Sequence, residues 1–264
     1  MNKKLYFLHI PKTGGMSIVN NIKDQLKENN VKSFIFHDEE YDGLNKYTYI
    51  QGHIGTYPIN NLTNIDTISI LRDPIERSVS TFLHLYPTVI FGRGLIYDKM
   101  NNIKDKLRYY LFEDVHYKDH YNLQSKFLCL NGEKDLINEI KPQSWQAVFK
   151  RSHRWNLEHG DFSFEKAKTT IDSMKMCTTI ENHELLSNFI ETWFLENYNI
   201  IIKIKKEKRF NESKIKYFEN DYDTKTLISM LSDNEKSMIA KNNSIDFEIY
   251  HYLKNKQEKT NEFN

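Results

Sequence analysis

The sequence predicts an α/β fold with a central parallel sheet flanked by helices and a largely helical carboxyl-terminal half. Two observations support this prediction. Short apolar runs at residues 5–10, 47–51 and 67–71 are each followed by a turn and a candidate helix, which is the pattern of a doubly wound parallel sheet. From about residue 100 onward, apolar residues recur mostly with helical spacing, and the length of 264 residues suits one large domain.

The first strand and the first helix are the clearest elements. Residues 5–10 form a short apolar run that ends at a proline, as expected for a buried parallel strand. A turn with the sequence PKTGGMS follows over residues 11–17. Apolar residues then recur at four-residue spacing at Ile18, Ile22 and Leu26. This spacing predicts an amphipathic helix that Ser17 caps and that the Asn-Asn pair at residues 29–30 stops.

A further helix is predicted to begin at Pro74, because a proline at the first helical position loses no hydrogen bond. Apolar residues line one face of it, namely Ile75, Val79, Phe82 and Leu83. Other periodic segments predict a strand at residues 176–180 and helices at 101–112, 122–130, 164–174 and 185–196. The domain is expected to cover residues 1–254, and residues 255–264 are expected to form a polar, frayed tail.

Composition excludes several classes of protein. Lys and Arg number 37 against 36 Asp and Glu, a formal net charge of +1, whereas nucleic-acid binders usually carry a clear basic excess. We therefore expect no nucleic-acid partner, and any anion site must be a local concentration of positive charge. The apolar runs are too short to span a membrane, and Cys129 and Cys177 lack metal-ligand spacing. These observations predict reduced thiols, no bound metal and a cytoplasmic protein.

The turn at residues 11–17 has the features of an anion site. At the amino terminus of a helix, several backbone N–H groups have no helical partner, and the helix dipole favours an anion there. Gly14 and Gly15 let the backbone approach a phosphate closely, while Lys12 adds a positive charge and Ser17 adds a hydroxyl donor. The alternative is a plain glycine-containing turn between a strand and a helix.

This turn differs from the P-loop of nucleotide triphosphatases, GxxxxGK[ST]. Its lysine precedes the glycines, and no Lys-Ser or Lys-Thr pair follows that would hold magnesium. An early lysine without a metal ligand suits the transfer of a group with less charge than a γ-phosphate, such as a sulfuryl group.

A second candidate anion site lies where the predicted strand at residues 67–71 runs into the helix that begins at Pro74. The sequence there is ILRDPIERSVS, with Arg72 at the strand end and Ser80 two turns into the helix. Ligands bind at the carboxyl edge of a doubly wound sheet, so these two side chains are expected to hold a further phosphate. The alternative is a surface Arg–Asp pair with a helix cap.

Together, the two motifs resemble those of a known family. FLHIPKTGGMS and ILRDPIERSVS look like the 5'-phosphosulfate loop and the 3'-phosphate motif of sulfotransferases that use 3'-phosphoadenosine-5'-phosphosulfate (PAPS). The branch that the chain resembles is the carbohydrate O-sulfotransferases that include heparan sulfate 2-O-sulfotransferase. Met16 stands where that family usually has Thr, so one hydroxyl donor is absent there, although the backbone N–H of Met16 remains.

The resemblance implies a P-loop-like fold and the in-line transfer of a sulfuryl group from PAPS to a hydroxyl, with PAP as product. The implied acceptor is a carbohydrate or a small molecule that carries a hydroxyl. The residues that the resemblance assigns to PAPS are Lys12, Thr13, Gly14, Gly15, Met16, Ser17, Arg72 and Ser80. Weaker similarity continues at residues 122–128, 176–181, 209–213 and 246–253.

An acceptor hydroxyl must lose its proton as the new S–O bond forms, which requires a base. In the 2-O-sulfotransferases that the chain resembles, a His-Gly-His segment supplies the proposed base. The chain has Gln51 at the first of these positions and His53 at the second, after a predicted strand. We hypothesise that His53 is the general base. His84 is the alternative base, and His9 is interpreted as a packed residue beside the phosphate loop.

Other charged residues near the motifs have predicted roles. Lys12 is expected to stabilise the bridging oxygen of the leaving group. Asp73 and Glu76 are interpreted as partners of Arg72 or Arg77, because a carboxylate beside a sulfonate would repel it.

Two segments and two rival functions stay open. The basic run at residues 203–209 is either an anion-binding segment or a solvated face, and residues 86–100 are predicted to shape the acceptor site.

A small-molecule kinase would require a magnesium-holding Ser or Thr after a lysine and an acidic strand end, and neither is evident. The other rival is a PAP- or nucleotide-binding module without catalysis, which Gln51 and Met16 keep open. The acceptor and the oligomeric state are left undetermined.

Overall fold

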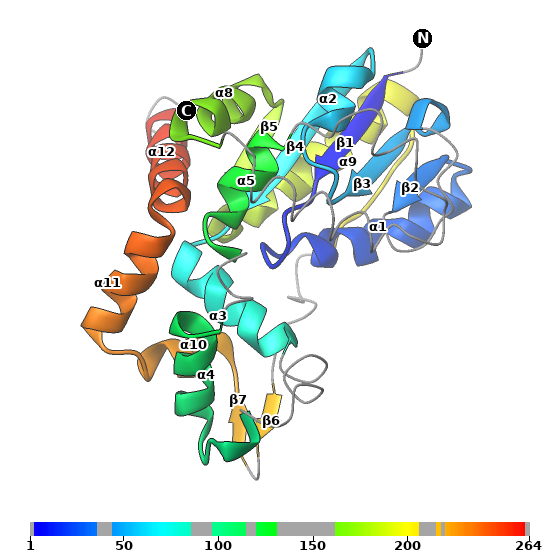
Figure 1. The fold of residues 1–264 in the computed structure, drawn as a ribbon. Helices are drawn as coiled ribbons and strands as arrows, with labels where there is room; N and C mark the ends of the chain where they lie inside the picture. Colours follow the sequence, from blue (N-terminus) through cyan, green and yellow to red (C-terminus); the bar gives the residue numbers. More distant parts are fainter. Residues whose placement is uncertain are drawn as a thin grey trace, which may run out of the picture.

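The computed structural model of the protein describes residues 3–35, 44–85, 97–114, 120–130, 162–205, 215–217 and 220–261. Five strands form a parallel sheet in the order β2-β3-β1-β4-β5 (Figure 1). They are β1 (Lys4–Leu8), β2 (Ser33–Ile35), β3 (Tyr49–Gly52), β4 (Ile65–Leu71) and β5 (Met176–Thr179). The predicted α/β class, with a parallel central sheet flanked by helices, is confirmed.

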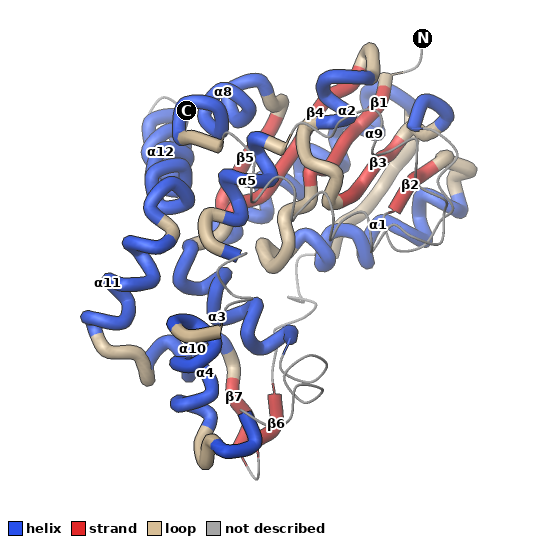
Figure 2. The backbone as a smooth tube through the Cα atoms, in the orientation of Figure 1, coloured by secondary structure: helices blue, strands red, loops and turns tan. Residues whose placement is uncertain are grey.

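Helices connect and cover the strands, as the tube in Figure 2 shows. Those around the sheet are α1 (Gly15–Glu28), α2 (Tyr57–Asn61), α3 (Pro74–Leu85), α5 (Leu123–Cys129), α8 (Phe164–Ser173), α9 (His183–Tyr198) and α12 (Ser244–Asn261). Three further helices pack with α3 beyond the carboxyl edge of the sheet (Figure 1): α4 (Ile103–Phe112), α10 (Thr224–Ser229) and α11 (Asp233–Asn242). A short antiparallel hairpin, β6 (Ile215–Tyr217) and β7 (Asn220–Tyr222), lies near them.

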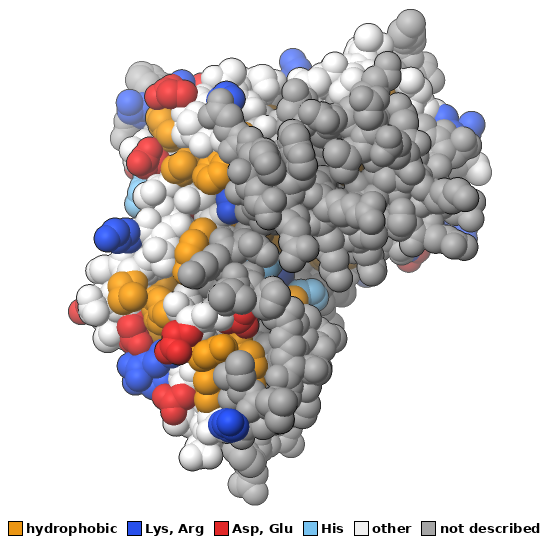
Figure 3. Space-filling model, in the orientation of Figure 1, with side chains coloured by type: hydrophobic (Ala, Val, Ile, Leu, Met, Phe, Trp, Pro, Cys, Tyr) orange, Lys and Arg blue, Asp and Glu red, His pale blue; other side chains and the backbone are white. Residues whose placement is uncertain are grey.

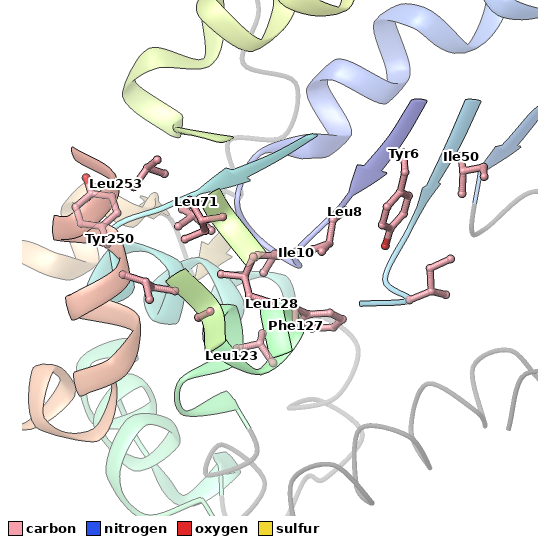
Figure 4. Packing of buried hydrophobic residues seen from close by; sticks show 14 of the residues in the cluster. Tyr6, Leu8, Ile10, Ile50, Leu71, Leu123, Phe127, Leu128, Tyr250 and Leu253 are labelled. Atoms are coloured by element: carbon pink, nitrogen blue, oxygen red, sulfur yellow. The ribbon is translucent and has the colours of Figure 1, made fainter. Parts of the chain in front are cut away.

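Two apolar layers bury the two faces of the sheet. Successive residues of a strand point to opposite faces, so β1 contributes Leu5 and Phe7 to one layer and Tyr6 and Leu8 to the other. In the first layer the sheet packs against α1 and α9, through Ile18, Val19, Ile22, Leu26, Leu186, Ile190 and Phe194. In the second layer, which Figure 4 shows, it packs against α5, α8 and α12, through Leu123, Phe127, Leu128, Ala167, Ile171, Tyr250 and Leu253.

The strand order creates a ligand edge. β1 lies at the centre, and its last residue, Leu8, is opposite both Gly52 of β3 and Ser69 of β4. The strands that follow β1 in the chain, β2 and β3, lie on one side of β1. The strands β4 and β5 lie on the other side. The carboxyl ends of β1 and β4 therefore flank the point where the strand order reverses. Open α/β sheets bind their ligands at this point.

The predicted elements of the described chain are found with shifted ends, and three features differ. The predicted cap of the first helix, Ser17, is wrong, because α1 begins at Gly15 with Gly14 as its N-cap at φ 91°. Glycine adopts this left-handed conformation at no steric cost. The strands β2, β6 and β7 were not predicted, since three residues are too few to show an alternation, and the helices α10 and α11 were not predicted individually. Helix α12 continues to Asn261, so it covers most of the segment expected to fray.

Charges of both signs lie side by side on the described surface (Figure 3). No helix in the described ranges is long and apolar enough to cross a membrane. Cys129 and Cys177, both within the described chain, form no disulfide.

A buried polar cluster, here called the Asp246 junction (Arg77, Gln124, Ser125 and Asp246), joins α3 to the first turns of α5 and α12. Asp246 accepts hydrogen bonds from the backbone N–H groups of Gln124 (3.1 Å) and Ser125 (2.7 Å), and from the Ser125 hydroxyl (2.6 Å). Arg77 Nε lies 3.8 Å from the same carboxylate, and both side chains have no exposed surface. The junction thus holds an ion pair and the start of a helix away from water.

Replacing Asp246 by Ala should lower the free energy of unfolding by about 3–5 kcal/mol, because Arg77 would stay buried without its counter-charge. Urea unfolding at equilibrium measures this change. Asp172→Ala is the matched control, since Asp172 also binds α12, through Lys256 (2.7 Å) and Tyr252 (2.5 Å), but at the surface. That variant should lose about 1 kcal/mol. Equal losses in the two variants would contradict the role given to burial.

Candidate active site

The turn between β1 and α1 is held by its own backbone and by Thr13. The Thr13 hydroxyl donates to the Ile10 carbonyl (2.8 Å), and the side chain is fully buried. Lys12 (φ 67°) and Gly14 (φ 91°) both adopt left-handed backbone conformations, which cost a lysine roughly 1–2 kcal/mol. Helix α1 has no side-chain cap and no acidic residue in its first turn. The Ser17 N–H donates to the Gly14 carbonyl (3.1 Å), whereas the N–H groups of Gly15 and Met16 precede the helical hydrogen-bond pattern and, with the positive end of the helix dipole, favour an anion.

Gly15 is required by packing beneath the loop. A Cβ at this position would lie 2.4 Å from His9 Cδ2 and 2.9 Å from Phe7 Cζ. A Cβ on Gly14 would lie 2.8 Å from Ile180 Cδ1, in addition to its positive φ. The sequence interpretation assigned both glycines to the approach of a phosphate, and the structure adds these contacts as a second reason. His9 is buried, as predicted for a packed residue.

Arg72 reaches the Lys12 loop from the end of β4. Its Nη1 donates to the Lys12 carbonyl (3.4 Å), and its Nε pairs with Glu76 (3.1 Å), the partner that the sequence predicted. Burial, and then the charge of Arg72, lowers the pKa of Lys12 to about 8. Two cations therefore lie near each other in a partly buried place. An anion bound beside them would offset both causes of the lowered Lys12 pKa, namely burial and the charge of Arg72.

Asp73 has a structural role next to these cations. Its Oδ1 accepts hydrogen bonds from the backbone N–H groups of Ile75 (2.9 Å) and Glu76 (3.0 Å), which caps the first turn of α3. Burial raises the pKa of Asp73 in spite of these bonds. Asp73 thus acts on the helix that follows it, and Glu76 acts on Arg72.

His53 directly follows β3 and lies beside the same turn. Its Nδ1 is 2.5 Å from the carbonyl oxygen of His9. Because a carbonyl oxygen only accepts, Nδ1 carries the proton, and the lone pair of the neutral ring is on Nε2. The ring centroid of His53 is 4.7 Å from that of His9 and 6.0 Å from that of Phe127. The structure therefore brings a half-buried imidazole next to the residues that precede the phosphate loop.

Gln51 lies one position before the Gly52-His53 pair, and its side chain is fully buried. Its Nε2 donates to His9 Nδ1 at 2.5 Å, so the proton of the neutral His9 ring is on Nε2. The Gln51 Oε1 is buried without a hydrogen-bond partner in the described part of the chain. Gln51, His9 and His53 thus form a polar chain beneath the loop, in which Gln51 orients a ring.

Ser80 and His84 lie further along α3. Ser80 is buried, at 3% exposed, and lies roughly 9 Å along the helix axis from Pro74. His84, the alternative base, is exposed in the last turn of α3, about 15 Å along the axis from Pro74. Residues 86–96 of the predicted acceptor segment lie outside the described residues.

The basic run is described only at its start. The Lys203 side chain is 76% exposed and pairs with Glu191 at 3.1 Å. The Lys203 backbone N–H donates to Gln25 Oε1 of α1 (2.9 Å), and its carbonyl accepts from Gln25 Nε2 (2.8 Å). Residues 206–209 of this run, and the segment at 209–213 that resembles the family, lie outside the described residues. Of the described residues, Lys203 and Lys205 are exposed and Ile204 is buried, so whether the run binds an anion stays a prediction.

Three residues at this edge were not predicted to have a role: Gln124, Glu181 and Tyr250. Gln124 hydrogen-bonds both backbone groups of Arg72. Glu181 lies in the turn directly after β5. The pKa of Tyr250 is raised, first by burial and then by the negative charges of Glu181 and Asp73. These residues are distant from the motifs in sequence, so no local pattern marks them. The only signal was the weaker family similarity of residues 122–128, 176–181 and 246–253.

Comparison with known proteins decides the family. A family model described as the sulfotransferase family matches residues 1–253. The chain belongs to the sulfotransferase family. This family uses PAPS as donor and includes carbohydrate sulfotransferases. The match covers the Lys12 loop, Arg72 and His53 as well as α12 almost to its end. No curated protein matches the chain significantly.

Gly15→Ala should lower the free energy of unfolding by about 1–3 kcal/mol, because the new Cβ meets the His9 ring. Urea unfolding measures the loss. The double variant Gly15→Ala/His9→Ala should be more stable than the sum of the single changes predicts, because the smaller side chain makes room. Strict additivity would show that the contact beneath the loop does not matter.

Anion binding should depend on the protonation of Lys12, whose pKa is about 8 in the free protein. A bound phosphate raises this pKa, so binding takes up a proton above pH 8 and the affinity falls as pH rises from 8 toward 10. Calorimetric titration with PAP over this range measures the slope. In Lys12→Arg the slope should disappear, because arginine stays charged. An unchanged slope in Lys12→Arg would assign the titration to another group.

Proposed function

We propose that the protein is an O-sulfotransferase that transfers the sulfuryl group of PAPS to an acceptor hydroxyl, with a carbohydrate as the acceptor class. The observation that carries the proposal is the approach of Arg72 to the Lys12 turn, across the carboxyl ends of β4 and β1. PAPS presents one anionic group at its 5' end and another at its 3' end. Two cationic strand ends side by side match this pair of anions.

The residues around the two strand ends fit the donor. The uncapped first turn of α1, with Gly15, Met16 and Ser17, would hold the 5'-phosphosulfate together with Lys12. Arg72, which precedes α3, and Ser80, which lies within α3, would together hold the 3'-phosphate. In the structure the Arg72 guanidinium forms an ion pair with Glu76. A bound phosphate would compete with Glu76 for the N–H donors of this guanidinium.

His53 is the proposed general base. Its Nε2 would accept the proton of the acceptor hydroxyl as the hydroxyl oxygen attacks sulfur. The Nδ1–H bond to the His9 carbonyl supports this role, because it keeps the lone pair on Nε2 and stabilises the imidazolium that forms.

Lys12 would act on the leaving group. As the bond between sulfur and the 5'-phosphate oxygen breaks, negative charge appears on that oxygen, and the Lys12 ammonium would donate a hydrogen bond to it. The lowered pKa of Lys12 supports this role, since a less basic ammonium is a stronger hydrogen-bond donor.

Thermal unfolding with PAP, ADP and magnesium-ATP at equal saturating concentrations tests the donor. A ligand at about 100 times its Kd adds roughly 2.7 kcal/mol, so PAP should raise the Tm by several degrees and by more than ADP does. Preference for magnesium-ATP would point to a kinase instead. Transfer of labelled sulfate from PAPS to a panel of glycans and phenols then tests the reaction. PAP binding without transfer to any acceptor would favour a nucleotide-binding module.

His53→Ala should lower kcat by about 10²- to 10⁴-fold while the Kd for PAP stays within about threefold, because only the proton transfer is lost. Initial-rate kinetics and calorimetry measure the two quantities. His84→Ala is the control, and it should retain full turnover because His84 lies in the last turn of α3. Full turnover in His53→Ala would assign the base to another residue.

A further inference from the structure

The backbone of Arg72 has an unusual partner. Arg72 lies between β4 and α3, where it belongs to neither element. Its N–H donates to Gln124 Oε1 (2.9 Å), and its carbonyl accepts from Gln124 Nε2 (2.9 Å). The side-chain amide thus pairs with Arg72 as a neighbouring strand would. Gln124 is fully buried, so water does not compete for these bonds.

The backbone of Gln124 is itself held in place by Asp246. It is the second residue of α5, a helix of seven residues, which is too short to be stable without tertiary contacts. Asp246 binds the backbone N–H groups of Gln124 and Ser125, and Arg77 supplies the counter-charge. The position of the Gln124 side chain is therefore fixed by the Asp246 junction.

Two asparagines, Asn122 and Asn243, add to this anchor. The Asn122 N–H donates to Asn243 Oδ1 (3.0 Å), and Asn122 Oδ1 accepts from the Asp246 N–H (3.2 Å). Asn243 also accepts from Arg77 Nη2 (3.3 Å). The start of α5 is tied in this way to the connection between α11 and α12.

We infer that Gln124 is a positioning residue that aims the Arg72 guanidinium at a 3'-phosphate, which makes the donor site selective for PAPS and PAP over nucleotides without that group. The inference rests on the proposed function. Arginine binds phosphate through a rigid planar fork, so its affinity depends on where its backbone is held. In the structure the guanidinium donates to the Lys12 carbonyl (3.4 Å) and pairs with Glu76 (3.1 Å), and it does so from a backbone that Gln124 holds on both its N–H and its carbonyl.

A purely structural role for Gln124 makes a different prediction. If the amide only attached α5 to β4, its loss would lower stability and weaken all nucleotides alike. Loss of a positioning residue instead weakens the ligand that carries a 3'-phosphate. The ratio of the Kd for ADP to the Kd for PAP, compared between variant and wild type, separates the two roles. ADP has the same adenosine as PAP, but it carries a 5'-diphosphate where PAP carries a single 5'-phosphate, and it lacks the 3'-phosphate.

The experiment measures both Kd values by calorimetry in the full-length chain. Gln124→Met keeps the length of the side chain and removes both hydrogen bonds. We expect it to reduce the ADP/PAP ratio by roughly tenfold to a hundredfold while the Kd for ADP changes by less than about threefold. Ser125→Ala is the matched control, since it removes the neighbouring hydroxyl from Asp246 (2.6 Å) and does not touch Arg72. It should leave the ratio unchanged even where stability falls.

The outcomes separate the inference from the function on which it rests. An unchanged ratio in Gln124→Met, or an equal loss in Ser125→Ala, overturns the positioning role. If Gln124→Met does not fold, Gln124→Glu takes its place, because it keeps an acceptor for the Arg72 N–H and loses the donor to the carbonyl. It should also lower the ratio, and an unchanged ratio there overturns the inference. A wild-type protein that binds ADP as tightly as PAP refutes the 3'-phosphate site itself, and this arm involves no variant of Gln124.

Discussion

The peptide groups that follow β1 and β4 impose the central constraint on this protein. Where a parallel strand ends, its N–H and carbonyl groups lose their neighbours, and buried groups must find other partners. Beyond β1, the carbonyl of Ile10 accepts from Thr13 and the carbonyl of His9 binds His53. Beyond β4, both groups of Arg72 pair with Gln124. Thr13 belongs to the same turn as Ile10, but His53 and Gln124 come from other segments of the chain. The ligand edge therefore keeps its shape only when the surrounding layers are assembled.

The same edge concentrates positive charge. Lys12 and Arg72 lie near each other, and burial, followed by the charge of Arg72, lowers the pKa of Lys12 to about 8. Glu76 offsets part of this cost from the surface side. A fold optimised for stability alone would not retain such a pair, whereas a site that binds an anion gains affinity from it. In the proposed function, this pair of cations lies where the donor would bind.

His9 connects the loop to the proposed base. Its ring lies beneath Gly15, its Nδ1 accepts from Gln51, and its carbonyl orients His53. One buried residue therefore fixes both the start of α1 and the direction of the imidazole. The Gln51 amide donates to the His9 ring without adding a further imidazole to the two, His9 and His53, that already lie beneath the loop.

The sequence by itself determined the α/β class, the glycine turn, the arginine at a strand end and the histidine after β3. These features follow from short-range periodicity and from backbone chemistry within a few residues. Only the tertiary structure decided that the turn after β1 meets Arg72, that Gly15 must leave room for His9, and that Gln124 grips the Arg72 backbone. It also decided that Gly14, in place of Ser17, precedes the first helix. The reason is physical: β1 lies between β3 and β4, and this strand order brings together residues whose separation in sequence hides their contact.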